Sequence, residues 1–197
     1  MAMDNRLQGA LKKHNGYITV ALGKEAGLSH TSILRAVKAG LVERVAHGVY
    51  ESVDEYGDML YANQLRRPKM IYSHGTALYL HDLTDRDPLN FSVTVPTGYN
   101  TKLLVSEGFT VFSVKRDLYG NGIIHMPTKY GNNVTTYSME RTICDCIRSR
   151  NRMDIEVVTD AVKCYARRKD RDIHTLMEMA SLFGVIKILR TYMEVLL

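Results

Sequence analysis

Tryptophan is absent from the sequence, and proline and cysteine are scarce: the 197 residues include no Trp, four Pro and three Cys. So few prolines, together with only 14 glycines, exclude a collagen-like or low-complexity polymer. No uninterrupted apolar run approaches the roughly 18 residues that a membrane-spanning helix needs, so we expect no membrane span. With 45% hydrophobic and 24% charged residues, the chain has a globular composition and can bury one sizeable core or two small ones.

The three cysteines, Cys144, Cys146 and Cys164, are an odd number, and the chain does not begin with a basic segment followed by an apolar core. This pattern argues against a disulfide framework and predicts a reducing, cytoplasmic location. Cys144 and Cys146 lack the second pair of ligands that a zinc site needs. We therefore predict that they are thiols of the hydrophobic core.

Common catalytic signatures are also missing, because no G-x-S-x-G elbow, G-x-x-x-x-G-K-[ST] loop or H-E-x-x-H helix occurs. His74 and His81 are followed by three aspartates, Asp82, Asp85 and Asp87. These residue types leave open a metal-assisted nuclease or hydrolase. Their spacing is loose, and the aspartates lie in a stretch typical of a polar turn. We therefore expect no enzyme, no cofactor and no metal, and keep the hydrolase as the alternative.

Basic residues exceed acidic ones by 26 to 21, which gives a net charge of +5 and a sequence pI of about 9.1. Most of the excess of basic residues lies in the N-terminal quarter of the chain, because residues 1–50 contain seven Lys and Arg but only three Asp and Glu. This distribution is compatible with a polyanionic partner such as nucleic acid.

The first fifty residues predict three helices and a hairpin. Asp4, Thr19 and Ser29 each stand where a side chain can cap a following amphipathic helix. In the third helix, the side chains of Ile33, Leu34 and Val37 are expected to point inward.

After Gly40 the hydrophobic period becomes that of two strands, 41–45 and 49–52, around a turn at 46–48. This order of elements is typical of a winged helix-turn-helix, whose third helix fits the major groove while its wing reaches the backbone. Such a module can also dock a protein, and the pattern alone leaves that reading open.

Residues 54–67 predict a further helix, with Tyr56, Met59, Leu60 and Asn63 on one side, and we place a domain boundary before Pro68. Beyond it, a helix capped near Ser73 and four short strands (91–95, 110–114, 123–126 and 134–137) precede helices around residues 139–147, 158–165, 173–180 and 185–197. We expect an α+β protein: an N-terminal winged helix-turn-helix domain, 1–67, then a mixed α/β C-terminal domain, 68–197, that ends in a helical cluster.

We predict that DNA is contacted by residues of the second and third helices and the wing, namely Lys24, His30, Ser32, Arg35, Lys38, Arg44 and His47. Arg35 is the best candidate for a base edge, because its planar guanidinium can meet guanine O6 and N7 together. A second basic surface is possible in the C-terminal domain, at Arg148, Arg150, Arg152, Lys163, Arg167 and Arg168. Aspartates nearby can pair with these cations at helical spacing.

Three segments carry a resemblance to a known family: AGLVERVAHGVY at 39–50, SHGTALYLHDLTD at 73–85 and SMERTICD at 138–145. In this order and spacing the sequence resembles the AbiEi family, the antitoxins of type IV toxin–antitoxin systems of abortive infection, a form of phage defence. The resemblance implies a transcriptional repressor that binds inverted repeats in its own operon promoter. It also implies a nucleotidyltransferase-like toxin as functional partner, without a stable complex, and leaves open self-association on the DNA.

The resemblance assigns the DNA-reading role to Arg35, Lys38 and Arg44. His47 stands where such wings often carry a second arginine, which argues against a strong minor-groove contact. The segment 140–145 is interpreted as structural, because it begins a helix in which Arg141 and Asp145 can pair at i and i+4.

Overall fold

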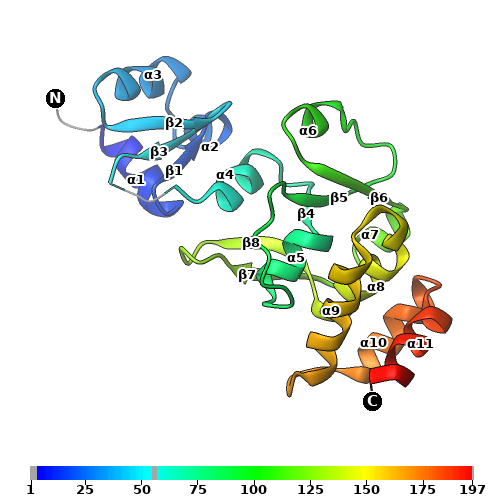
Figure 1. The fold of residues 1–197 in the computed structure, drawn as a ribbon. Coiled ribbons are helices and arrows are strands. Elements are labelled where there is room, and N and C mark those ends of the chain that lie inside the picture. Colours follow the sequence, from blue (N-terminus) through cyan, green and yellow to red (C-terminus); the bar gives the residue numbers. More distant parts are fainter. Residues whose placement is uncertain (1–3, 55–56, 197) are drawn as a thin grey trace. The chain divides into compact units, whose positions relative to one another are not determined.

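The computed structural model describes residues 4–54 and 57–196 (Figure 1). Contacts divide the chain into two compact units. The N-terminal unit consists of Met1–Pro68 and Pro127–Val134, and the C-terminal unit of Lys69–Met126 and Thr135–Leu197. Whether residues 1–67 and 68–197 fold as two separate domains stays a prediction. The sequence analysis did not anticipate that 127–134 would group with the N-terminal unit.

The N-terminal unit has the predicted order of elements (Figure 1). Its helices and strands are α1 (Asn5–Lys13), β1 (Tyr17–Thr19), α2 (Val20–Glu25), α3 (His30–Lys38), β2 (Val42–Ala46), β3 (Val49–Ser52) and α4 (Met59–Arg66). The three strands form an antiparallel, wing-like sheet in the order β1-β3-β2. All three predicted caps are confirmed, since the side chains of Asp4, Thr19 and Ser29 accept hydrogen bonds from the first turns of α1, α2 and α3.

The core of this unit lies between the first three helices and the sheet. Its buried residues are Leu7, Ala10, Leu11, Ile18, Leu28, Ile33, Ala36, Val42 and Tyr50. The helices approach closely at Gly23, where a Cβ would stand 2.7 Å from Cδ1 of Ile33. The prediction that Leu34 points inward was wrong: its side chain is 42% exposed. Ile33 and Ala36, three residues apart, form the buried face of α3. Leu34 follows Ile33 and is turned from it by about 100° around the helix axis, so its side chain points away from this face.

The predicted helix over 54–67 begins later, at Met59. The carboxylate of Asp58 caps it by accepting a hydrogen bond from the backbone N–H of Tyr61. Met59 and Asn63 lie four residues apart on one side of α4, as the spacing predicted, but Met59 at its start is exposed and Asn63 is buried. Tyr56 lies outside the described residues.

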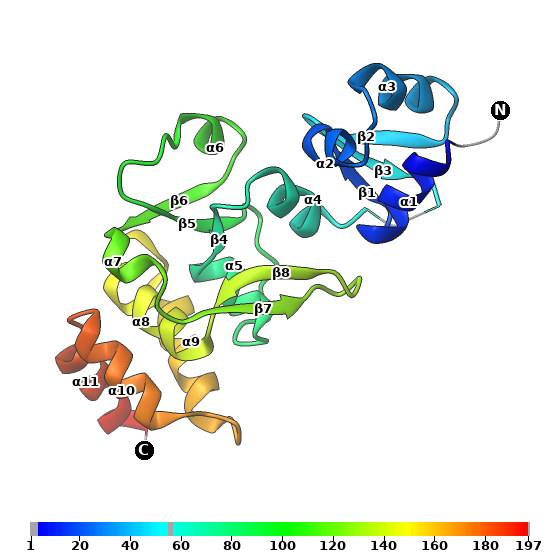
Figure 2. The same cartoon turned by 180° about the vertical axis from the view of Figure 1, so that it is seen from behind.

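The C-terminal unit is built on a mixed five-stranded sheet in the order β6-β5-β4-β8-β7, seen from behind in Figure 2. Its strands are β4 (Ile71–Tyr72), β5 (Ser92–Pro96), β6 (Thr110–Val114), β7 (Ile123–Pro127) and β8 (Asn133–Tyr137). Strand β4 pairs antiparallel with β5 and parallel with β8, and β5 pairs parallel with β6. Helix α5 (His74–Leu80) follows β4. The short elements β4, α6 (Lys102–Ser106) and α7 (Arg116–Tyr119) were not predicted, because two to five residues are too few to show a period.

Four helices complete this unit: α8 (Met139–Arg148), α9 (Ile155–Arg167), α10 (Ile173–Leu182) and α11 (Ile186–Leu196), with a 3-10 turn, η1 (Arg150–Arg152), after α8 (Figures 1 and 2). Helix α8 is central: its residues from Glu140 to Ile147 are all buried. Cys144 and Cys146 are among them, as predicted for core thiols, and burial raises the pKa of Cys144 to about 12. The α+β fold with a terminal helical cluster is confirmed. Within the residues described, no helix has the length and apolarity to span a membrane.

Candidate nucleic-acid interface

The outer face of α3 carries several of the residues predicted to bind DNA. His30, Arg35 and Lys38 are exposed, and Ser32 is half-buried beside the capping Ser29, with their Oγ atoms 2.9 Å apart. No ion pair joins Arg35 or Lys38 to a carboxylate in the described part of the chain. Their charges are therefore available to an outside anion.

Within the hairpin of β2 and β3, hydrogen bonds hold the side chain of Arg44 in place. Arg44 donates from Nη2 to Nδ1 of His47 over 2.7 Å, and from Nε to the carbonyl of Ala46 over 3.4 Å. His47 therefore accepts at Nδ1, so that a neutral ring carries its proton on Nε2. Both side chains are exposed, and the pairing presents them together at the tip of the wing.

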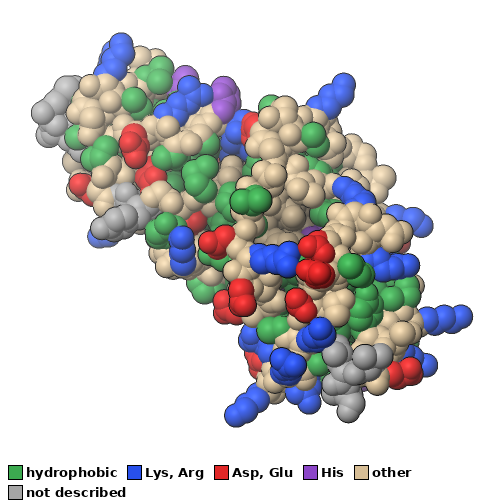
Figure 3. All heavy atoms as spheres, in the orientation of Figure 1, with side chains coloured by type: hydrophobic (Ala, Val, Ile, Leu, Met, Phe, Trp, Pro, Cys, Tyr) green, Lys and Arg blue, Asp and Glu red, His purple; other side chains and the backbone are tan. Residues whose placement is uncertain are grey.

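His30 connects the start of α3 to the sheet, because its Nε2 lies 3.2 Å from the hydroxyl of Tyr50 on β3. Helix α3 also contacts β2, the strand that bears Arg44. Lys24 stands apart in the last turn of α2, where it is exposed. Figure 3 shows basic and histidine side chains gathered over α3 and the hairpin tip. Six of the seven predicted residues thus lie on α3 and the adjoining hairpin; that this surface binds DNA stays a prediction.

Leu34 is a residue of this face that the sequence analysis missed. It is exposed on α3 and precedes Arg35 directly. The exposure of Leu34 could have been predicted from the spacing of Ile33 and Ala36. If alanine is counted as a core residue, these two positions define the buried face of α3. An exposed leucine there offers an apolar contact beside the charged ones.

Four of the six cations predicted as a second basic surface line two separate hollows of the C-terminal unit, and Arg150 and Arg168 line neither of these two hollows. Arg148 and Arg152 line one hollow, and Lys163 and Arg167 line another. Two of the six are paired on the surface: Arg168 with Asp170 over 2.8 Å, and Lys163 with Asp160 over 3.4 Å. Whether these cations contact DNA stays a prediction.

The two histidines of the alternative enzyme hypothesis do not converge. Nε2 of His81 donates to the carbonyl of Tyr137 over 2.7 Å, whereas both ring nitrogens of His74 lie 3.0 Å from serine hydroxyls, those of Ser73 and Ser149. His74 begins α5 and His81 follows its last residue, so the length of the helix separates them. In the described ranges, no group of three or more His, Cys, Asp or Glu residues could hold a metal ion.

The predicted pair of Arg141 and Asp145 is confirmed, and it is fully buried. Nε of Arg141 donates to Oδ2 of Asp145 over 2.8 Å, and its Nη1 donates to the carbonyls of Leu118 and Asn121. The guanidinium carbon lies 4.1 Å from the ring centroid of Tyr137 and 3.8 Å from that of Phe183. These contacts support the interpretation of this segment as structural.

Gly122 makes room for this arginine. Its φ is +76°, and a Cβ there would stand 2.9 Å from Cβ of Arg141. Both the backbone conformation and the close approach therefore require glycine.

Comparisons with known proteins agree with the fold and with the N-terminal pattern. Residues 6–53 match the family model described as "Transcriptional regulator, AbiEi antitoxin". The chain is similar in structure to the RV2827C protein from Mycobacterium tuberculosis, with a TM-score of 0.58 and 10% sequence identity over 94% of this chain and 78% of that one. At this identity the likeness shows the fold alone. No curated protein matches the sequence.

Proposed function

Because residues 6–53 match the model of the AbiEi antitoxin family of transcriptional regulators, we propose that this protein is a type IV antitoxin that represses its own operon. Helix α3 enters the major groove of inverted repeats in the promoter, and the wing contacts the backbone. The observation that carries the proposal is the exposed face of α3, where Arg35 and Lys38 have no carboxylate partner among the described residues.

Inverted repeats call for two copies of the protein on one operator, which associate in solution or on the DNA. The antitoxin activity resides in the C-terminal unit and counteracts a nucleotidyltransferase-like toxin without a stable complex. We further propose that the protein is not an enzyme, since its residues 6–53 match the model of a family of transcriptional regulators, and that it acts in the cytoplasm.

The DNA contact is tested by titrating the full-length protein onto the DNA upstream of its own gene at several salt concentrations. Arg35 is assigned to a base edge, so three cations, Lys24, Lys38 and Arg44, are left for phosphates and predict a slope of log K against log salt of about −2.7 per bound module, since each phosphate contact contributes about −0.9. Arg35→Ala together with Lys38→Ala is expected to reduce the slope to about −1.8. Loss of the Arg35 base contact alone is expected to weaken binding by about 1–3 kcal/mol.

A matched control removes two exposed charges from α11, through Lys187→Ala together with Arg190→Ala. This variant has the same net charge as the first and is expected to retain the affinity and slope of the unmodified protein. Equal affinity of both double variants for the upstream DNA would show that α3 is not the recognition helix.

Leu34 is expected to recognise thymine, because its exposed side chain can pack on the C5-methyl group in the major groove. Upstream DNA prepared with deoxyuridine in place of thymidine lacks only that methyl. The unmodified protein is expected to prefer the thymidine duplex roughly fourfold for each methyl contacted, since burying one such group is worth about 0.8 kcal/mol.

Leu34→Ala is expected to abolish this preference while it retains salt-dependent binding. If the variant and the unmodified protein discriminate equally between the two duplexes, Leu34 does not contact a thymine.

A further inference from the structure

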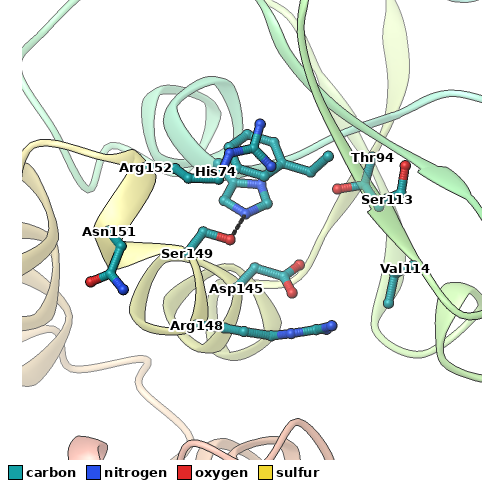
Figure 4. A pocket seen from close by; sticks show the side chains of 10 residues that line it. His74, Thr94, Ser113, Val114, Asp145, Arg148, Ser149, Asn151 and Arg152 are labelled. Carbon is teal, nitrogen blue, oxygen red and sulfur yellow. Dashed lines mark hydrogen bonds between the residues drawn. The ribbon is translucent and has the colours of Figure 1, made fainter.

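A polar hollow of about 340 Å³ opens in the C-terminal unit, and none of its lining residues belongs to α3 or the wing (Figure 4). It lies between strand β6, the beginning of α5, and the end of α8 with the turn that follows. The side chains that carry its chemistry are His74, Asp145, Arg148, Ser149, Asn151 and Arg152. Its volume falls in the range of small-molecule sites, roughly 300–1,000 Å³.

The inner wall of the hollow is a preorganised set of buried polar groups. His74 is 3% exposed and stacks on Phe112, with ring centroids 3.4 Å apart. Its Nε2 lies 3.0 Å from the Ser149 hydroxyl, the bond drawn in Figure 4. On the other side its Nδ1 lies 3.0 Å from the Ser73 hydroxyl, which accepts a hydrogen bond from Thr94. Every polar atom of the ring is therefore held in place.

Backbone strain accompanies this arrangement, because His74 has a φ of +48°, in the left-handed region that residues other than glycine rarely adopt. Such conformations persist where the surrounding structure enforces them, and they are concentrated at binding and catalytic sites. Burial, followed by the charges of Arg141, Arg152 and Arg148, lowers the pKa of His74 to about 3. The ring is thus neutral at physiological pH, and it adds no positive charge to the hollow.

Positive charge comes instead from two arginines at the hollow. Arg152 is held in place, because its guanidinium carbon lies 4.4 Å from the Phe112 ring centroid and its Nη2 donates to the carbonyl of Val111. Arg148 is exposed at the end of α8. Neither forms an ion pair with a carboxylate in the ranges that the structure describes. Two unpaired guanidinium groups beside one small hollow favour a phosphate, which arginine binds through paired hydrogen bonds.

Asp145 restricts the kind of phosphate compound that fits. Its carboxylate is 4% exposed, lines the hollow, and uses Oδ2 to accept from Arg141. A carboxylate in the wall repels a second anion and accepts hydrogen bonds from hydroxyl or amino groups. A duplex backbone presents phosphates and acceptor oxygens, whereas a mononucleotide carries one phosphate end together with hydroxyl and amino donors.

We propose that this hollow binds a small phosphorylated ligand of the mononucleotide type. Its phosphate lies against Arg148 and Arg152, and its hydroxyl or amino groups face Asp145. The site gives the C-terminal unit a ligand of its own, separate from operator DNA.

The proposal is tested by isothermal titration calorimetry of the full-length protein with 5′-AMP, 5′-GMP, adenosine and inorganic phosphate. One of the two mononucleotides is expected to bind with a Kd below about 1 mM, and adenosine and inorganic phosphate at least about tenfold more weakly. Arg148→Gln is expected to weaken mononucleotide binding by about tenfold or more, since it removes a charge-assisted bond. Arg190→Gln on α11 also removes one exposed arginine and is expected to leave binding unchanged.

Arg148 is chosen because it is exposed, so its replacement keeps the buried pair of Arg141 and Asp145 intact. Absence of heat with both mononucleotides, equal binding of inorganic phosphate, or an unchanged Kd in Arg148→Gln would each overturn the proposal. If mononucleotides fail to bind and Arg148→Gln weakens binding to the upstream DNA, the hollow contacts the DNA backbone instead. These results are independent of the tests on Arg35 and Lys38, so the two proposals can fail separately.

Discussion

Replacing Arg141 with alanine is expected to lower the free energy of unfolding of the C-terminal unit by about 3–5 kcal/mol. The side chain is 0% exposed and pairs with a carboxylate that is itself buried. Its removal leaves Asp145 as an uncompensated charge in the core and takes the guanidinium donor away from the carbonyls of Leu118, which keeps backbone donors, and Asn121. It also opens a cavity between the rings of Tyr137 and Phe183.

Urea unfolding followed by circular dichroism measures this loss. Arg190→Ala, which removes an exposed arginine of α11, is the matched control and is expected to change the free energy of unfolding by less than about 0.5 kcal/mol. A second variant, Arg141→Met together with Asp145→Leu, removes both charges and is expected to lose less stability than Arg141→Ala alone. A loss below about 1 kcal/mol for Arg141→Ala would contradict the assignment of this pair as a structural centre.

Asp58→Ala is expected to destabilise the N-terminal unit by roughly 2–4 kcal/mol, because the carboxylate serves three donors in a buried position. It caps α4 through the N–H of Tyr61 and accepts from the side chains of Thr128, over 2.5 Å, and Asn132, over 2.9 Å. The last two residues belong to the segment 127–134, which lies more than sixty residues further along the chain. Without the carboxylate, the cap is lost and both side chains lose a buried partner.

The same variant is expected to loosen the segment 127–134, and limited trypsin digestion at Lys129 reports on this directly. Cleavage after Lys129 is expected to be faster in Asp58→Ala than in the unmodified protein, since cleavage follows the population of the locally opened state. Asp54→Ala, which removes an exposed carboxylate nearby, is the control and is expected to leave both stability and cleavage unchanged. Unaltered cleavage and unaltered unfolding in Asp58→Ala would show that the segment is held by other contacts.

The neighbours of Asp58 also explain why the segment groups with the N-terminal unit. The hydroxyl of Tyr17 on β1 donates to Glu51 over 2.6 Å and accepts from the backbone N–H of Asp58 over 2.6 Å. The amide of Asn15 donates to Asn132 over 2.8 Å. A chain ending at residue 68 would lack the partners that Thr128 and Asn132 supply, so we expect such a fragment to be less stable than the same residues in the full-length protein.

Local patterns determined much of this protein from the sequence alone. Capping side chains, helical periodicity and the change of period after Gly40 predicted the order of α1, α2, α3 and the hairpin, because these signals depend on residues within a few positions of one another. The pairing of Arg141 with Asp145 was predictable for the same reason, since four residues span one helical turn.

Tertiary structure alone decided which faces are buried and which distant residues meet. The exposure of Leu34 depends on how closely α2 and α3 pack at Gly23, and the bonds from Asp58 to Thr128 and Asn132 join residues that no local pattern connects. His74 and Asp145 face one hollow because α5 and α8 pack together, whereas His81 is turned toward the backbone of β8. Helical and strand periods specify the direction of a side chain relative to its own element, but the packing of one element on another sets which side chains come within bonding distance.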